Sequence, residues 1–137
     1  MSARTKARKR ALDVLYSADV REQPLADALA TEDARSLTQP DRKASWHYAA
    51  QIVQGVIDRG DEIDEQLRTY AKDWPLERMP AIDRALLRIG AWEILCNPEV
   101  PDAVAIAEAV ELAGELSTDD SARFVNGVLG RIAATRA

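Results

Sequence analysis

The segment from Ala81 to Leu95 constrains the fold of this chain more than any other, because it is apolar around most of its circumference. Its second part, from Ala85 to Leu95, reads ALLRIGAWEIL and contains only two charged residues. A surface helix keeps a polar face, whereas a helix that is apolar on nearly all sides is buried. The segment therefore predicts the central helix of a helical bundle.

The rest of the chain also has helical periodicity. Helices are expected over residues 5–20, 25–35, 41–59 and 61–70, and a further helix runs from residue 80 to just before Asn97. The sixth helix is expected to start at Pro101 and Asp102, and the last to open at residues 117–120 and continue through Ile132. Asp61 is expected as an N-cap, Pro80 as the first residue of its helix, and the run Ser117-Thr118-Asp119-Asp120 as a capped helix start. In the sixth helix, Ile106, Val110 and Ala113 are expected to face inward. No segment alternates apolar and polar residues in the manner of a strand, so the sequence predicts an all-α fold of about seven helices.

The composition excludes several classes of site. The 137 residues include one cysteine, Cys96, and one histidine, His47, which leaves no internal disulfide and little for metal binding. Neither residue lies in a recognisable catalytic signature, and the six glycines are scattered singly rather than gathered in a phosphate-binding loop. We therefore expect no enzyme activity, no catalytic residue, no metal and no cofactor. No apolar run approaches the roughly 20 residues of a membrane span, so we expect a cytoplasmic protein.

The charges are unevenly distributed along the chain. Five of the first ten residues are basic and none is acidic, whereas the remaining 13 basic and 23 acidic side chains give the rest of the chain a charge of −10. A basic arm on an acidic body suits the phosphate backbone of a nucleic acid. The same composition is also typical of a solvated chain end. Because the arm leads directly into the helical pattern of Leu12, Leu15 and Tyr16, we expect its charges to lie at the start of a helix.

A second candidate surface lies near the C-terminal end, in the segment Ser121–Leu129. Arg123 and Phe124 together offer a cation for phosphate and an aromatic ring on which a base can stack, the two components that usually recognise single-stranded RNA. Phe124 also has helical spacing with Val128, which is typical of core packing. Tyr16 is similarly divided between the core and an RNA surface, and Asp120 is better explained as a helix cap.

Four blocks of the sequence together resemble the NusB family of bacterial transcription antitermination factors. They are ALDVLY from Ala11, IDRALLRI with WEIL from Ile82, VPDAVAIAEAVELA from Val100, and FVNGVL from Phe124. The blocks occur in order over nearly the whole chain, and the LSTDDS run from Leu116 is similar to the actinobacterial branch. The resemblance implies one RNA-binding domain over residues 1–137, built as two three-helix subdomains of about 1–79 and 80–137.

The resemblance also implies a function. Members of the family bind the boxA element of nascent ribosomal RNA together with the ribosomal protein NusE, and so help RNA polymerase to read through terminators. The positions in this sequence that match the family's RNA surface are Arg4, Lys6, Arg8, Lys9, Tyr16, Asp120, Arg123 and Phe124. Asp83 and Arg84 fall where the family meets NusE. The arm departs from some members by including lysines and Thr5.

Two alternatives remain at this point. One is a helical RNA-binding module related to the N-terminal domain of ribosomal RNA cytosine methyltransferases, which continue into a large catalytic domain, whereas this sequence ends at Ala137. The other is an interaction protein that forms a homodimer and covers its basic arm with a second copy. The sequence leaves open the oligomeric state, the preferred RNA bases, the affinity for NusE and the arm residues that contact phosphate.

Overall fold

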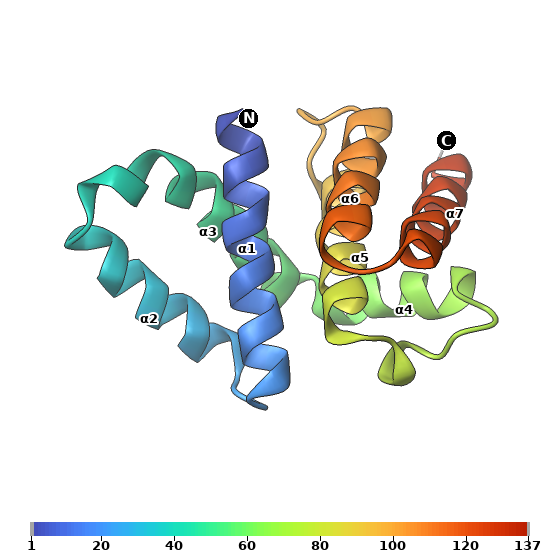
Figure 1. Cartoon of the computed structure of the whole chain (residues 1–137), viewed down its shortest axis with the longest axis horizontal. Helices are drawn as coiled ribbons and strands as arrows, with labels where there is room; N and C mark the ends of the chain where they lie inside the picture. The colour runs from blue at the N-terminus through green and yellow to red at the C-terminus, as the bar shows by residue number, and fades with distance from the viewer. Residues whose placement is uncertain (1, 137) are drawn as a thin grey trace. The chain divides into compact units, whose positions relative to one another are not determined.

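The computed structural model describes residues 2–136 and is helical throughout (Figure 1). The α-helices are α1 (Ala3–Val20), α2 (Leu25–Leu37), α3 (Lys43–Asp58), α4 (Gly60–Tyr70), α5 (Ala81–Cys96), α6 (Asp102–Leu116) and α7 (Asp119–Thr135). Two short 3₁₀ helices, η1 (Pro40–Arg42) and η2 (Leu76–Arg78), precede α3 and α5. No β-strand occurs in residues 2–136, and the predicted all-α fold is confirmed.

The chain divides into two compact units between Asp58 and Arg59. The N-terminal unit contains α1 to α3, and the C-terminal unit contains α4 to α7. The sequence placed this boundary near residue 79 and expected three helices in each part. The structure differs because α4 packs against α5 and α7, which makes it the fourth helix of the C-terminal unit.

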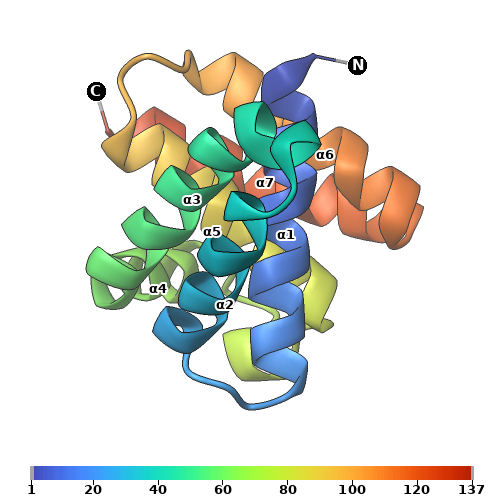
Figure 2. The same cartoon turned by 90° about the vertical axis from the view of Figure 1, so that its left-hand side faces the viewer.

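In the N-terminal unit, α1 packs against both α2 and α3 (Figure 2). The buried residues of α1 include Ala11, Leu12 and Leu15, and those of α3 include Ile52 and Val53. The buried residues of α3 recur every three to four positions, as at Ala49, Ile52 and Val56, and those of α1 do the same, so each helix has one apolar face and the two faces form the core of this unit. The opposite side of α1 therefore faces solvent and can carry polar residues.

In the C-terminal unit, α5 contacts α4, α6 and α7 and is the central helix that the sequence predicted. Ten of its 16 residues are buried, among them Leu86, Leu87 and Ile94. Gly90 allows α7 to approach closely, because a Cβ at this position would lie 2.5 Å from a methyl carbon of Leu129. The apolar circumference of α5 thus reflects contact with three neighbouring helices.

Several predicted helix details are wrong. Arg59 rather than Asp61 occupies the N-cap of α4, and Asp61 lies in the first turn, where its charge suits the helix dipole. Pro80 is the N-cap of α5 instead of its first residue. In α6, the inward face consists of Ala105, Ala109, Leu112 and Ala113, whereas Ile106 and Val110 are only half-buried. Small alanines thus occupy the face on which α6 meets α5 and α7.

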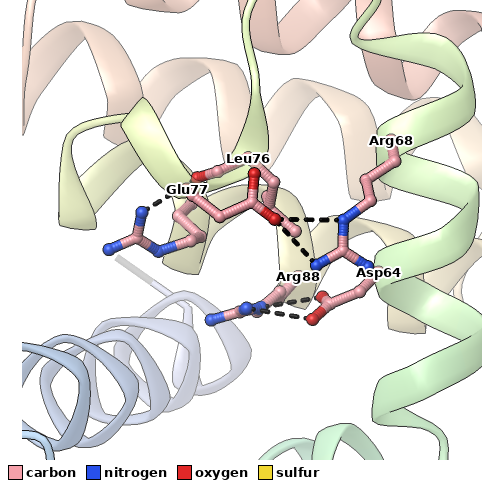
Figure 3. A network of polar contacts seen from close by, with 6 residues as sticks. Asp64, Arg68, Leu76, Glu77 and Arg88 are labelled. Atoms are coloured by element: carbon pink, nitrogen blue, oxygen red, sulfur yellow. Dashed lines mark hydrogen bonds and ion pairs between the residues drawn. The ribbon is translucent and has the colours of Figure 1, made fainter.

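Charged pairs join the segments around the start of α5 (Figure 3). The Arg88 guanidinium donates two hydrogen bonds to the Asp64 carboxylate, at 2.9 and 3.0 Å, and so links α5 to α4. Arg68 of α4 donates to one carboxylate oxygen of Glu77 in η2, at 3.2 and 3.0 Å. The first pair is largely shielded from solvent and the second is exposed. The bidentate Arg88–Asp64 pair therefore gives the stronger link between two elements.

Candidate nucleic-acid interface

The predicted basic arm is the start of α1. Ser2 caps the helix, since its hydroxyl oxygen accepts a hydrogen bond from the backbone N–H of Thr5 at 3.1 Å. The helix begins at Ala3, two residues before the predicted start, and holds the basic side chains at fixed positions on its first turns. Cations at this end oppose the helix dipole, so an anion bound here would be favoured by both the side chains and the helix.

The cations of the arm differ in their exposure. Arg4 and Lys6 are exposed and Lys9 is half-buried, but Arg8 is only 3% exposed. Both arginines lie over the ring of Tyr48 in α3, with their guanidinium carbons 4.6 Å (Arg4) and 5.9 Å (Arg8) from the ring centroid. These cation–π contacts fix the arginines against the helical core. Arg4 thus presents an oriented guanidinium to solvent, whereas Arg8 is covered.

The exposed side of α1 carries Lys6, Lys9 and Tyr16 in one line. Their spacings of three and seven residues place them on the same face of the helix. Tyr16 is 40% exposed, so part of its ring and hydroxyl group faces solvent. Tyr16 is thus not packed fully into the core. Two cations and an aromatic ring on one face can contact phosphate and base together.

In the C-terminal unit, Asp120, Arg123 and Phe124 lie on the first turns of α7. Asp120 and Arg123 form an ion pair at the surface, and both side chains are largely exposed. Phe124 is half-buried and meets Trp74 edge to face, with 4.9 Å between the ring centroids. The core positions of α7 are filled by Val125, Val128, Leu129 and Ile132 instead. Phe124 thus lies at the edge of the core, beside the exposed Arg123.

The cap of α7 is Thr118. Its hydroxyl oxygen accepts a hydrogen bond from the backbone N–H of Ser121 at 2.9 Å. Asp120 lies in the first turn and is not the cap that the sequence favoured. Its carboxylate is paired with Arg123, so the two residues form one polar group on the surface.

The two residues predicted to meet NusE have internal contacts. Asp83 is fully buried at 0% exposure, and its Oδ2 accepts a hydrogen bond of 2.7 Å from the Ser121 hydroxyl group. Its Oδ1 has no hydrogen-bond partner among the described residues. Arg84 donates from Nη1 to the carbonyl oxygens of Leu76 and Met79, at 2.9 and 3.1 Å. In this conformation, Asp83 links α5 to the start of α7, and Arg84 fixes the turn before α5.

Two aromatic residues that support the candidate surfaces were not assigned to them from the sequence. The buried ring of Tyr48 contacts Arg4, which lies 44 positions earlier in the chain. The ring of Trp74 supports Phe124, which lies 50 positions later. Nothing in the local pattern of either segment indicates these pairs, because each depends on how helices distant in sequence pack.

Metal-binding clusters and membrane-spanning helices are both absent from residues 2–136. This part of the chain contains no group of three or more His, Cys, Asp and Glu side chains that could hold a metal ion. None of its helices has both the length and the apolar character needed to cross a membrane. The candidate nucleic-acid contacts are thus two separate surfaces, one on α1 in the N-terminal unit and one at the start of α7 in the C-terminal unit.

Comparison with known proteins identifies close relatives. A family model described as "NusB family" matches residues 5–134. The chain is 65% identical to the transcription antitermination protein NusB of Leifsonia xyli subsp. xyli, over 99% of this chain and 94% of that protein. It is 61% identical over the full length of both chains to the protein of the same name from Clavibacter sepedonicus.

Solved structures share the fold. A structure of NusB from T. maritima matches with a TM-score of 0.82 and 31% identity, covering 96% of this chain and 90% of that one. A crystal structure of the antitermination factors NusB and NusE in complex with dsRNA matches with a TM-score of 0.82 and 24% identity, covering 98% of each chain. At that identity the second match supports the fold alone.

Proposed function

The chain belongs to the NusB family, and from this premise we propose that it is a transcription antitermination factor that binds RNA and not an enzyme. It binds boxA-type RNA in ribosomal RNA leader transcripts together with ribosomal protein NusE, and promotes read-through by RNA polymerase. Because such a factor acts on nascent bacterial transcripts, it works in the cytoplasm. The relatives with 61–65% identity over nearly their whole length support this function over a module of a methyltransferase.

The observation that carries the RNA-binding proposal is the exposed face of α1. Arg4, Lys6 and Lys9 lie within two turns at the positive end of the helix, and Tyr16 follows Lys9 two turns later on the same face. We assign phosphate contacts to these three cations and a base contact to Tyr16. Arg8 is buried and contributes indirectly. Its guanidinium lies against the ring of Tyr48, and the same ring positions Arg4.

The start of α7 supplies a second proposed RNA contact, in the C-terminal unit. Arg123 offers a charge-assisted hydrogen bond to phosphate, and Asp120 orients its guanidinium in the free protein. The half-buried ring of Phe124 offers an edge or face to a base, while Trp74 holds it from the other side. RNA that binds Arg123 must compete with Asp120, so the ion pair weakens contacts with unselected RNA.

We propose that Asp83 and Arg84 act on NusE binding through the segments that they hold. The buried Asp83 carboxylate fixes Ser121 at the start of α7, and Arg84 fixes η2 and Met79 before α5. Changing either residue would move a backbone segment at the surface of the C-terminal unit. A homodimer that covers the basic arm is a competing use of the same face, and RNA would displace the second copy.

Fluorescence-anisotropy titration over a series of salt concentrations tests the RNA-binding proposal. Replacing Arg4, Lys6 and Lys9 with alanine should weaken binding of boxA and of unrelated RNA to a similar degree. The slope of log K against log salt should fall by roughly 0.7 for each lost phosphate contact. A matched control replaces the exposed cations Lys43, Lys72 and Arg78, which removes the same charge from positions outside the proposed surface.

The expected control result is a slope close to that of the wild type. If the arm variant keeps the affinity and slope of the wild type, both with and without NusE, the arm is not the phosphate contact. If arm and control variants lose the same slope, the binding reflects net charge alone. Phe124→Ala should cost on the order of 1–3 kcal/mol of binding free energy without changing the slope, provided that its circular-dichroism melt shows a folded protein.

A further inference from the structure

A groove runs between α1 and α2 in the N-terminal unit, with Trp46 of α3 among its lining residues. Its volume is about 400 Å³, within the range of ligand sites. Along α1 and its C-cap residue it is lined by Arg10, Asp13, Ser17 and Arg21, none of which belongs to the proposed RNA surface. The helices that form it contact each other directly, and α2 begins beside the C-terminal end of α1 and runs back obliquely (Figure 1).

Two arginines in this groove have N–H groups that donate no hydrogen bond to a described residue. Arg10 donates from Nε to the Ser45 hydroxyl group at 2.6 Å, and its two terminal NH₂ groups have no protein partner among the described residues. Arg21 is exposed and forms no side-chain hydrogen bond or ion pair with described residues. A third arginine, Arg35, is neutralised by Glu32 at 3.0 Å. The groove therefore offers two guanidinium groups to an anionic ligand.

The distance between these two arginines sets the length of a ligand that can contact both of them. Arg10 and Arg21 are 11 residues apart on α1 and face the same groove, so a rise of 1.5 Å per residue separates their Cα atoms by about 16 Å along the helix axis. One phosphate or carboxylate cannot reach both. An extended peptide advances roughly 3.3 Å per residue, so residues five positions apart span about the same distance.

The residues between the arginines distinguish a peptide from a nucleic acid. Between these two arginines the groove is lined by hydroxyl groups such as that of Ser17 and by the Glu32–Arg35 ion pair, and its lining residues include no further cation. A nucleic acid strand carries a negative charge on every nucleotide and would leave some of these charges without a cation. A peptide can carry acidic residues at two positions and uncharged residues between them. The pattern of charge thus favours a peptide.

We propose that this groove binds an extended acidic segment of a partner protein, about six residues long, with a carboxylate side chain at each end. The two end carboxylates pair with Arg10 and Arg21. The hydroxyl groups of Ser17 and Thr31 hydrogen-bond to the peptide backbone between them. The small residues Val14 and Ala28 leave room for the backbone to approach.

Fluorescence anisotropy at low ionic strength, where screening is weak, tests this proposal with the full chain. The probe is a labelled hexapeptide, Glu-Ser-Gly-Ser-Gly-Glu, and a peptide with Gln at both ends is the control ligand. The Glu peptide should bind saturably and at least five-fold more tightly than the Gln peptide. Arg10→Gln and Arg21→Gln should each weaken it at least five-fold, whereas Arg68→Gln in the C-terminal unit should leave it unchanged.

Reversing the charge of both an arginine and its peptide partner distinguishes loss of the contact from loss of structure. Two further probes each have Lys in place of one of the two terminal Glu residues. One of them should bind the Arg21→Glu variant, and which one binds shows the direction in which the peptide lies in the groove. Failure of the Glu peptide to bind would overturn the proposal, as would equal binding of the Gln peptide. Preferential binding of a hexauridylate, with the same dependence on Arg10 and Arg21, would also overturn it and would make the groove an additional RNA contact.

Discussion

Gly90 shows how a single residue sets the distance between two helices. A Cβ at this position would lie 2.5 Å from Cδ1 and 3.2 Å from Cδ2 of Leu129, whose side chain is fully buried in the core. We expect Gly90→Ala to lower the free energy of unfolding by about 1–3 kcal/mol, because overpacking outweighs the higher helix propensity of alanine. Urea denaturation followed by circular dichroism measures the change.

Gly130 provides the matched control, because nothing beyond its chain neighbours and the local backbone of its own helix lies within 4 Å of the Cβ position that alanine would occupy there. It is also within a helix, α7, so Gly130→Ala should raise the free energy of unfolding by about 0.5–1 kcal/mol. Equal changes in the two variants would mean that α5 and α7 are further apart than the structure has them.

Cys96 allows a second test at the residue scale. Partial burial raises the pKa of its thiol, and the charge of Arg59 opposes that rise. Only the thiolate reacts with iodoacetamide, so the midpoint of the rate–pH profile should lie above the pKa of about 8.5 of an unperturbed cysteine. Arg59→Gln should shift the midpoint further upward. A midpoint below that of a small cysteine peptide would contradict the burial of this thiol.

At the scale of elements, the start of α7 depends on Thr118. Thr118→Ala removes the acceptor for the backbone N–H of Ser121, so we expect a loss of about 1 kcal/mol in the free energy of unfolding. Thr118→Ser keeps the hydroxyl group and should retain most of the stability. Thermal melts of both variants give the comparison, and equal losses would mean that the methyl group of Thr118 matters more than its hydrogen bond.

The helices were predictable because their periodicity is local, but their ends depend on individual capping contacts. The apolar run from Ala85 to Leu95 was sufficient to locate α5 in the sequence. The start of α1 was missed because the cap, Ser2, precedes a run of cations that would ordinarily disfavour a helix start. The start of α4 was missed because Asp61 is a residue type that favours the N-cap, whereas the helix already begins at Gly60 and Arg59 occupies the N-cap.

At the scale of the whole molecule, the two units differ in charge. Residues up to Asp58 contain nine basic and eight acidic side chains, a charge of +1, whereas those from Arg59 contain nine and 15, a charge of −6. This contrast, and the basic start, were visible in the sequence. The contacts of Arg4 with Tyr48, Phe124 with Trp74 and Asp83 with Ser121 were not, because each joins residues at least 38 positions apart.

The stability of the C-terminal unit should depend on the core around α5. Leu86 is 1% exposed in the helix that contacts α4, α6 and α7, so Leu86→Asp would place a carboxylate where no water or cation compensates for its lost hydration. We expect a loss above 4 kcal/mol, enough to abolish the cooperative circular-dichroism melt. The same change at Leu116, which is 46% exposed at the end of α6, should leave the melt within a few degrees of the wild type. An unchanged melt for Leu86→Asp would mean that α5 lies on the surface, and the bundle built around it would then be wrong.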